Sequence, residues 1–216
     1  MRETRFIRKL SYACVAILIC GTAMAGDLIR APGRSSIVPL RDIDVPDAAP
    51  LGTNLTVDPC TGCNYDSNAG GYYVWGLNNC ETPGTTQWIA VPFIASHSAA
   101  PRQILASINL DNVCVSSGTQ VTLGIYSDTC AGPGTLLASG VATVPAAPCA
   151  VATARLRGAP ALVAGTKYWV GATTVSPTQD GLSGIWYASN QSQIGGNVSS
   201  GGWFQFSGFV PGFQVQ

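Results

Sequence analysis

Charged residues are scarce in this chain of 216 residues, making up only 10% of it. Lys and Arg together number 11, as do Asp and Glu, so the formal net charge is zero. A nucleic-acid-binding protein needs a basic surface to displace counterions from phosphates, and this balance argues against that class. Lysine and glutamate, abundant in coiled coils and helical bundles, are nearly missing. The composition therefore points away from nucleic-acid partners and from helical architectures.

The chain has a single histidine, His97. This scarcity removes most histidine-based catalysis and most transition-metal sites. His97 lies among small residues, and we expect a solvated loop imidazole rather than a general base. The motifs G-x-S-x-G, H-E-x-x-H and G-x-x-x-x-G-K-[ST] are also missing from the sequence. We therefore predict no enzymatic activity and no cofactor.

No apolar run is long enough to span a bilayer core of ~30 Å. The run from Leu10 to Cys20 follows four basic residues and precedes the small-x-small pattern Ala23-Met24-Ala25. This arrangement predicts a secretory signal peptide over residues 1–25. The alternative, a lipoprotein signal with Cys20 lipidated, is weaker because Ile19 is bulky. We expect a secreted mature chain, extracellular or periplasmic, with no membrane span after cleavage.

Six cysteines remain after the signal peptide is removed, and an even number in an oxidising compartment predicts up to three disulfides. They are Cys60, Cys63, Cys80, Cys114, Cys130 and Cys149. Fifteen connectivities are possible. A zinc site at Cys60 and Cys63 is a poor alternative, because no second C-x-x-C or histidine pair completes a tetrahedral set.

The composition divides the mature chain into a leader and one domain. Residues 26–50 are rich in proline and show no period, which predicts an exposed, extended leader. From residue 51, short apolar stretches alternate with turn residues, and residues 51–216 are long enough for a single core.

Period 2 dominates the domain and predicts an all-β fold. Val121, Leu123 and Ile125 fall on one face of a predicted strand, for example. We expect about ten short strands in a two-sheet antiparallel β-sandwich, jelly-roll-like and disulfide-bridged. The predicted strands are 72–78, 86–94, 103–111, 120–127, 135–143, 150–157, 167–174, 183–188, 202–206 and 211–216.

Two motifs resemble β-sandwich modules of bacterial secreted and surface proteins, most of them uncharacterised. The first is Val121-Thr-Leu-Gly-Ile-Tyr-Ser-Asp128, followed by Gly132-Pro-Gly-Thr-Leu-Leu137. The second is Leu162-Val-Ala-Gly-Thr-Lys-Tyr-Trp-Val170. The resemblance implies a β-sandwich fold and an extracellular setting, and it transfers no catalytic residue.

Adjacent aromatic residues are the most suggestive functional feature. In such a pair, strand alternation points one ring toward the core and the other outward. Outward rings can stack on sugar faces, whereas the competing interpretation is that they pack the core. The candidate ligand-binding residues are Tyr73, Trp75, Trp186, Tyr187 and Trp203.

Two further sites are weaker candidates. Oxygen-bearing side chains alternate around Asp66 and Asn68 as in a Ca²⁺ loop, but Trp75 stands where the closing glutamate belongs. A glycan hydrolase needs only two carboxyl groups at a suitable separation. The acids available for it are Asp58, Asp66, Glu81, Asp111, Asp128 and Asp180.

The leading hypothesis is a secreted, non-enzymatic module that binds a glycan or a surface protein through exposed aromatic residues. A structural protein of the surface or matrix, without a small ligand, is the first alternative. A glycan hydrolase is the second.

Overall fold

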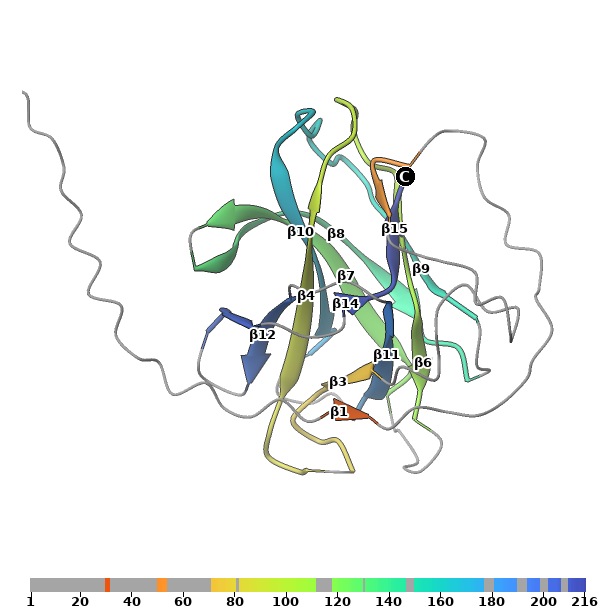
Figure 1. The fold of residues 1–216 in the computed structure, drawn as a ribbon. Helices are drawn as coiled ribbons and strands as arrows, with labels where there is room; N and C mark the ends of the chain where they lie inside the picture. Colours follow the sequence, from red (N-terminus) through yellow and green to blue (C-terminus); the bar gives the residue numbers. More distant parts are fainter. Residues whose placement is uncertain are drawn as a thin grey trace, which may run out of the picture.

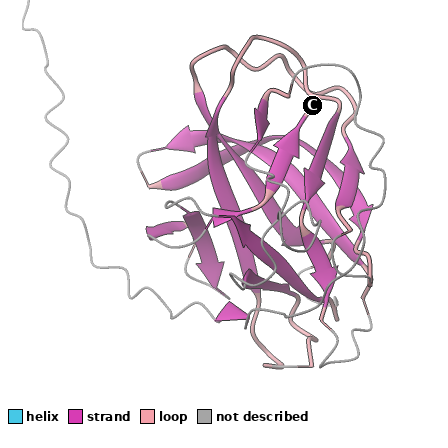
Figure 2. Ribbon diagram, turned by 45° about the vertical axis from the view of Figure 1, so that its right-hand side comes forward, coloured by secondary structure: helices cyan, strands magenta, loops and turns pink. Residues whose placement is uncertain are grey.

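The computed structural model describes residues 30–31, 50–53, 71–80, 82–111, 118–129, 131–146, 150–176, 181–189, 194–198, 202–206 and 210–216. Regular structure in these residues consists of strands alone (Figure 2). The described part of the chain thus contains no helix with the length and hydropathy to cross a membrane.

The strands form two antiparallel sheets (Figure 1). The main path of the larger sheet is β14 (Val210–Pro211), β11 (Ser183–Ser189), β3 (Gly71–Trp75), β4 (Gln87–Ile94), β10 (Lys167–Thr174), β7 (Gln120–Thr129) and β8 (Gly132–Thr143). Strands β1 (Arg30–Ala31), β6 (Ile108–Leu110), β12 (Ile194–Val198) and β13 (Phe204–Phe206) are attached to that path. The smaller sheet is β2 (Gly52–Thr53), β15 (Phe213–Val215), β5 (Gln103–Ala106) and β9 (Ala152–Arg155). This arrangement confirms the predicted all-β class and the pair of antiparallel sheets of a β-sandwich.

Strand β7 shows why the sequence pattern predicts the core well. Val121, Leu123 and Ile125 are all fully buried in the main hydrophobic core. Alternate residues of a strand face opposite sides, so these three side chains fill the space between the sheets. The neighbouring strand β10 contributes Val170 and Ala172 to the same core.

The segment predicted as one strand over 103–111 is two strands in different sheets. Strand β5 belongs to the smaller sheet and β6 to the larger one, and Ser107 lies between them. The buried hydroxyl of Ser107 lies 2.9 Å from the Tyr187 carbonyl oxygen and 3.0 Å from that of Gly212, and it donates to this pair. Gly212 similarly separates β14 of the larger sheet from β15 of the smaller one. Two chain segments therefore change sheets at the same corner.

The two sheets approach one another closely where the edge strands β8 and β9 meet. A Cβ atom added to Gly140 would lie 2.3 Å from the carbonyl oxygen of Arg155. Real Cβ atoms do not approach a backbone oxygen so closely, so glycine is required here for steric reasons.

Three short strands lie outside the predicted ones, β1, β2 and β12, and β2 pairs with β15 in the smaller sheet. Strand β12 pairs with β4 and β13, although Gly195 and Gly196 lower its strand propensity. Strand β1 pairs with β3, with Arg30 opposite Tyr72. Residues 30 and 31 lie within the predicted leader over residues 26–50, and their pairing with β3 attaches them to the larger sheet.

Candidate functional site

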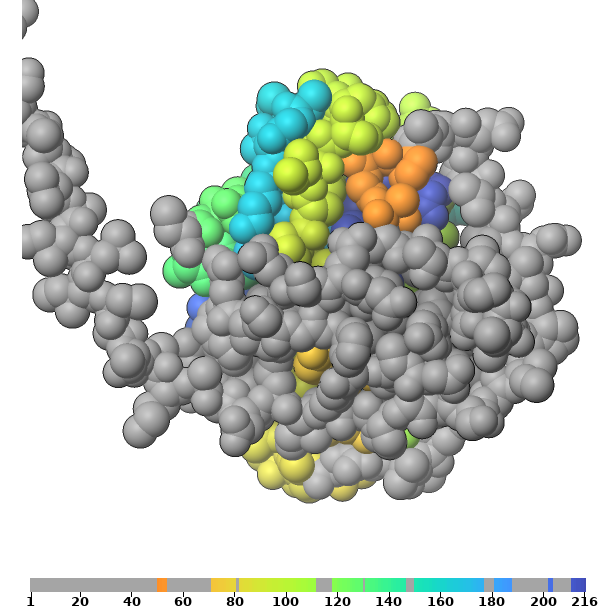
Figure 3. Space-filling model, in the orientation of Figure 1, coloured from red at the N-terminus to blue at the C-terminus, as the bar shows by residue number. Residues whose placement is uncertain are grey.

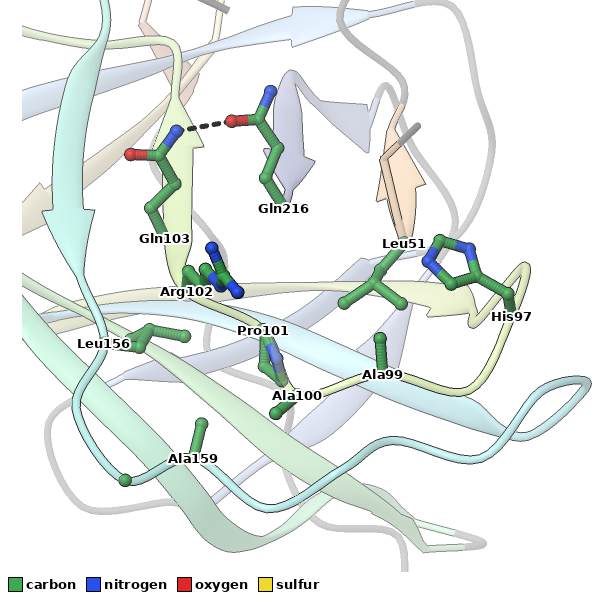
Figure 4. A pocket seen from close by; sticks show the side chains of 11 residues that line it. Leu51, His97, Ala99, Ala100, Pro101, Arg102, Gln103, Leu156, Ala159 and Gln216 are labelled. Atoms are coloured by element: carbon green, nitrogen blue, oxygen red, sulfur yellow. Dashed lines mark hydrogen bonds between the residues drawn. The ribbon is translucent and has the colours of Figure 1, made fainter. Parts of the chain in front are cut away.

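A cavity of about 660 Å³ lies beyond the ends of the strands of the smaller sheet (Figure 4). Its walls come from the segment before β2, the loop between β4 and β5, the turn after β9 and the residue after β15. Figure 3 shows residues 50–53 in orange beside the yellow-green atoms around the end of β4. We refer to this space as the end cavity.

The floor of the end cavity is apolar. Leu51 and Leu156 are buried and belong to the main core. Between them lie small side chains, those of Ala99, Ala100 and Pro101, which leave the space open. A ligand in the end cavity would thus rest on the edge of the hydrophobic core.

The polar groups of the end cavity lie around this floor. The Gln103 side-chain amide donates to the Gln216 side-chain oxygen, and the pair forms one wall (Figure 4). The backbone fixes this wall, because the Gln103 and Gln216 amides each donate to the other residue's carbonyl oxygen at 3.0 Å. Arg102 and His97 are exposed at the remaining sides.

Among the described side chains that line the end cavity, Arg102 is the only one with a permanent charge. Within the part of the chain that the structure describes, its guanidinium forms neither an ion pair nor a side-chain hydrogen bond. No acidic side chain is present in the described lining. The cavity therefore offers the Arg102 guanidinium above an apolar surface, with the main-chain carboxyl group of Gln216, the last residue of the given sequence, in one wall.

His97 has the exposure that the sequence predicts, and its imidazole contacts the neighbouring Ser96. The Ser96 hydroxyl donates to the Pro50 carbonyl oxygen at 3.0 Å. The same hydroxyl lies 2.9 Å from His97 Nδ1. The direction of the second contact depends on which imidazole nitrogen of His97 carries the proton.

A second cavity, of about 580 Å³, lies beside β7 and β10. Its charged side chains are Asp128 and Lys167, which form an ion pair at 3.1 Å. Since these two charges already satisfy one another, this cavity offers a ligand less than the end cavity does.

Four of the five predicted ligand-binding aromatics are buried, so the expectation that they are exposed is wrong for them. Tyr73, Trp75 and Tyr187 pack with Ile185 in a second hydrophobic cluster. The Tyr73 and Trp75 rings are stacked, with centroids 4.7 Å apart and 19° between their planes. Strand alternation does turn them away from the main core, as predicted. A binding role for them stays a prediction, and it would require this cluster to open.

Trp186 is fully buried in the main core. Its indole N–H donates to the Gly212 carbonyl oxygen at 2.8 Å, at the corner where two segments change sheets. Trp203 is the only one of the five that keeps partial exposure. Its ring meets the Tyr126 ring edge to face, with centroids 5.8 Å apart.

The Tyr126 ring lies on the outer face of the larger sheet, over two paired glycines. Gly124 and Gly171 are opposite one another on β7 and β10. A Cβ atom on Gly171 would lie 2.6 Å from the Tyr126 ring. Burial raises the pKa of the Tyr126 phenol above its ordinary value of 10.0, and a hydrogen bond with Thr173 offsets part of this rise. Sequence reasoning did not find this contact, although Gly124 and Gly171 interrupt otherwise apolar strands and a glycine there is a signal of close approach.

The described carboxylates do not form the pair that a glycan hydrolase needs. The Asp111 amide donates to Ser183 O, and Leu182 bridges Gly118 just before β7, so Asp111 lies near the beginning of β7. Asp128 lies near the end of the same strand, which places the two roughly 25 Å apart at ~3.3 Å per residue. Glycosidase carboxyl groups lie within ~10 Å of one another. The acids Asp58, Asp66, Glu81 and Asp180 lie outside the described residues.

Other predicted sites also fall outside the described part of the chain. This applies to the calcium candidates Asp66 and Asn68 and to five of the six cysteines. Cys80 is described, and its sulfur lies 3.7 Å from the Ser183 hydroxyl. Within the described residues, no group of three or more His, Cys, Asp or Glu side chains is placed to hold a metal ion. The disulfide framework and the calcium site stay predictions.

Comparison with protein-family models and with curated proteins gives no match for this chain.

Proposed function

We propose that this chain is a secreted, non-enzymatic β-sandwich module that binds a small ligand in the end cavity. The proposal is carried by the combination of an apolar floor, two side-chain amides and a guanidinium without a side-chain partner in the described chain, in a space of about 660 Å³. Binding sites for small molecules are typically ~300–1,000 Å³, mostly apolar, and oriented by a few polar groups. The end cavity has each of these properties.

The proposal includes a setting outside the cytoplasm. Its support is the signal peptide predicted over residues 1–25 and the even number of cysteines in residues 26–216. The jelly-roll-like connection of the strands and the disulfide bridges belong to the same proposal. Sequencing the N-terminus of the exported protein would test it, and Gly26 is the expected first residue.

The absence of an enzymatic role is part of the proposal, because the described lining of the end cavity contains no serine, threonine or cysteine side chain that a base could activate as a nucleophile. The lining holds one basic imidazole, that of His97, and no aspartate or glutamate side chain. Ser96 contacts His97 but does not itself line the cavity.

Glycan binding at Trp203 is the second candidate function. It is favoured by one observation, the partial exposure of this ring beside Tyr126. Aromatic faces of this kind can stack on sugars, and the ligand would then be a polysaccharide or a glycosylated surface protein. The described lining of the end cavity, by contrast, contains no aromatic ring except the His97 imidazole.

The end cavity is tested by titrating the oxidised protein with octanoate, 1-octanol and N-acetylglucosamine while amide chemical shifts are recorded. We expect saturable shifts at residues 97–103 with at least one probe. The variant Ala100→Trp fills the cavity and should abolish them, whereas Thr135→Trp, at an exposed position on β8, should not. Shifts in none of the three titrations would contradict the proposal.

A parallel experiment separates the alternatives. The protein is incubated with insoluble and soluble polysaccharides, and depletion of protein and release of reducing sugar are measured together. Depletion that Trp203→Ala removes would assign glycan binding to Trp203. Release of sugar would establish a hydrolase and overturn the non-enzymatic proposal.

A further inference from the structure

We propose that the ligand of the end cavity is a small amphipathic carboxylate, with an apolar body on the floor and its acid group at Arg102. This inference rests on the proposed function, because it assigns a chemical class to the ligand of that same cavity.

The apolar part of the ligand follows from the floor. Leu51 and Leu156 are nearly fully buried, at 2% and 8% exposure, and their remaining surface faces a space bounded by alanine and proline side chains. Apolar surface that leaves water there contributes about 25 cal/mol for each Å². An inorganic anion such as sulfate, which has no apolar surface, would gain nothing from this floor.

The acid group follows from the charges around the floor. Arg102 is the residue before β5, and its amide donates to Gln216 O while its carbonyl oxygen accepts from Leu156 N at 2.7 Å. The backbone of Arg102 is therefore held between β15 and the end of β9. Only its guanidinium is left without a partner in the described chain, and guanidinium groups bind carboxylates through two parallel hydrogen bonds.

The other charged and polar groups near the end cavity are compatible with an anionic ligand at Arg102. The other described basic side chains of residues 51–216 are Arg155, Arg157 and Lys167, and none of them lines this space. The described lining contains no acidic side chain, and its one carboxyl group is the main-chain group of Gln216, the last residue of the given sequence, which accepts from the Arg102 backbone amide. The Gln103 and Gln216 side chains already bond to one another, so they shape a wall without adding charge.

The test compares four probes that divide the ligand into its parts. Octanoate carries both parts, 1-octanol only the apolar body, acetate only the carboxylate, and sulfate a different anion. Dissociation constants are measured by calorimetry at low salt on the oxidised protein. We expect octanoate to bind at least ten-fold more tightly than each of the other three, and its affinity to fall as salt screens Arg102.

The variant Arg102→Gln removes the charge and keeps a hydrogen-bonding side chain. We expect it to weaken octanoate about ten-fold and to leave 1-octanol unchanged. Arg155→Gln is the matched control, since Arg155 is exposed on β9 and does not line the cavity. Circular dichroism of both variants verifies that they fold.

The outcomes separate this inference from the proposed function. Equal binding of 1-octanol and octanoate, or an Arg102→Gln variant that binds octanoate normally, would overturn the carboxylate and leave the cavity as a binding site. Equal binding of acetate or sulfate would overturn the apolar body. Binding of none of the probes would overturn both proposals.

Discussion

The indole N–H of Trp169 donates to the Asp128 carboxylate at 2.6 Å, joining β10 to β7 across the outer face of the larger sheet. Lys167 adds to this contact, with its ammonium 3.1 Å from Asp128 and 4.6 Å from the centroid of the Trp169 ring. All three residues belong to the two motifs that resemble secreted β-sandwich modules. Their mutual contacts give the two motifs a structural role, because they join β7 to β10.

Replacing Asp128 should destabilise the fold through Trp169. Trp169 is buried, so Asp128→Ala leaves its indole N–H without an acceptor, which costs about 1–3 kcal/mol. Asp128→Asn keeps an acceptor oxygen and should cost less than half as much. Urea unfolding at pH 7 measures both. Lys167→Met is the control, because a partly exposed ion pair is worth about 0–1 kcal/mol. Equal losses for all three variants would contradict a specific role of the indole.

Removing the hydroxyl of Ser107 should weaken the corner where the chain changes sheets. Ser107→Ala leaves two buried carbonyl oxygens with fewer donors, and we expect a loss of about 1–2 kcal/mol. Ser96→Ala is a matched control at an exposed site and should change stability by less than about 0.5 kcal/mol. Both are read as shifts in the urea midpoint at a constant slope. A stable Ser107→Ala variant would show that this corner does not depend on the hydroxyl.

Adding a methyl group to Gly140 should push the edges of the sheets apart. The new Cβ atom would overlap the Arg155 carbonyl oxygen, which belongs to the backbone of β9 and cannot swing aside as a side chain can. We expect Gly140→Ala to lower the free energy of unfolding by about 1–3 kcal/mol. Ser139→Ala changes the neighbouring exposed position and should be nearly neutral. Faster hydrogen exchange in β9 would confirm where the strain is released.

The raised pKa of Tyr126 predicts a loss of stability at high pH. In the unfolded chain the phenol ionises near its ordinary value of 10.0, whereas in the fold it holds its proton to higher pH. The folded state therefore binds more protons above pH 10, and the free energy of unfolding falls as the pH rises through this range. The variant Tyr126→Phe should show a shallower decline between pH 10 and 12. Parallel declines in both proteins would contradict the buried phenol.

Reduction should lower the melting temperature if the six cysteines form bridges. Each native disulfide is typically worth ~2–5 kcal/mol, largely because it restricts the unfolded chain. Melting curves with and without reductant are compared with the number of cysteines that react with iodoacetamide in the oxidised, unfolded protein. An unchanged melting temperature together with six reactive thiols would reject the disulfide framework.

The strands could be predicted from sequence because the alternation of side chains is local. The alternation of Val121, Leu123 and Ile125 along the strand is by itself evidence for a buried face, and the structure places all three in the core. The change of sheets at Ser107 could not be predicted, because the residues on both sides of it are apolar and the carbonyl groups that hold it come from Tyr187 and Gly212. Because distant residues cause the change of sheets at Ser107, the local alternation of apolar residues does not reveal it.

The candidate sites, like the strands, could be predicted only where the evidence in the sequence is local. Strand alternation predicts correctly that Tyr73 and Trp75 turn away from the main core, yet it contains no information on whether another layer covers them. The end cavity draws on segments near Leu51, Arg102 and Leu156 that only the completed sandwich brings together. The one sequence signal for the end cavity is the scarcity of lysine and arginine, because Arg102 is one of only four such residues in 51–216.

The position of β15 between β2 and β5 governs when the protein can finish folding. Before residues 213–215 have been synthesised, β2 has no neighbour in the smaller sheet. Only the two-stranded pair of β5 and β9 can form in that sheet at this stage. Two strands alone are marginally stable in water. A chain still emerging from the ribosome therefore remains open on one side of its core until its last strand has been made.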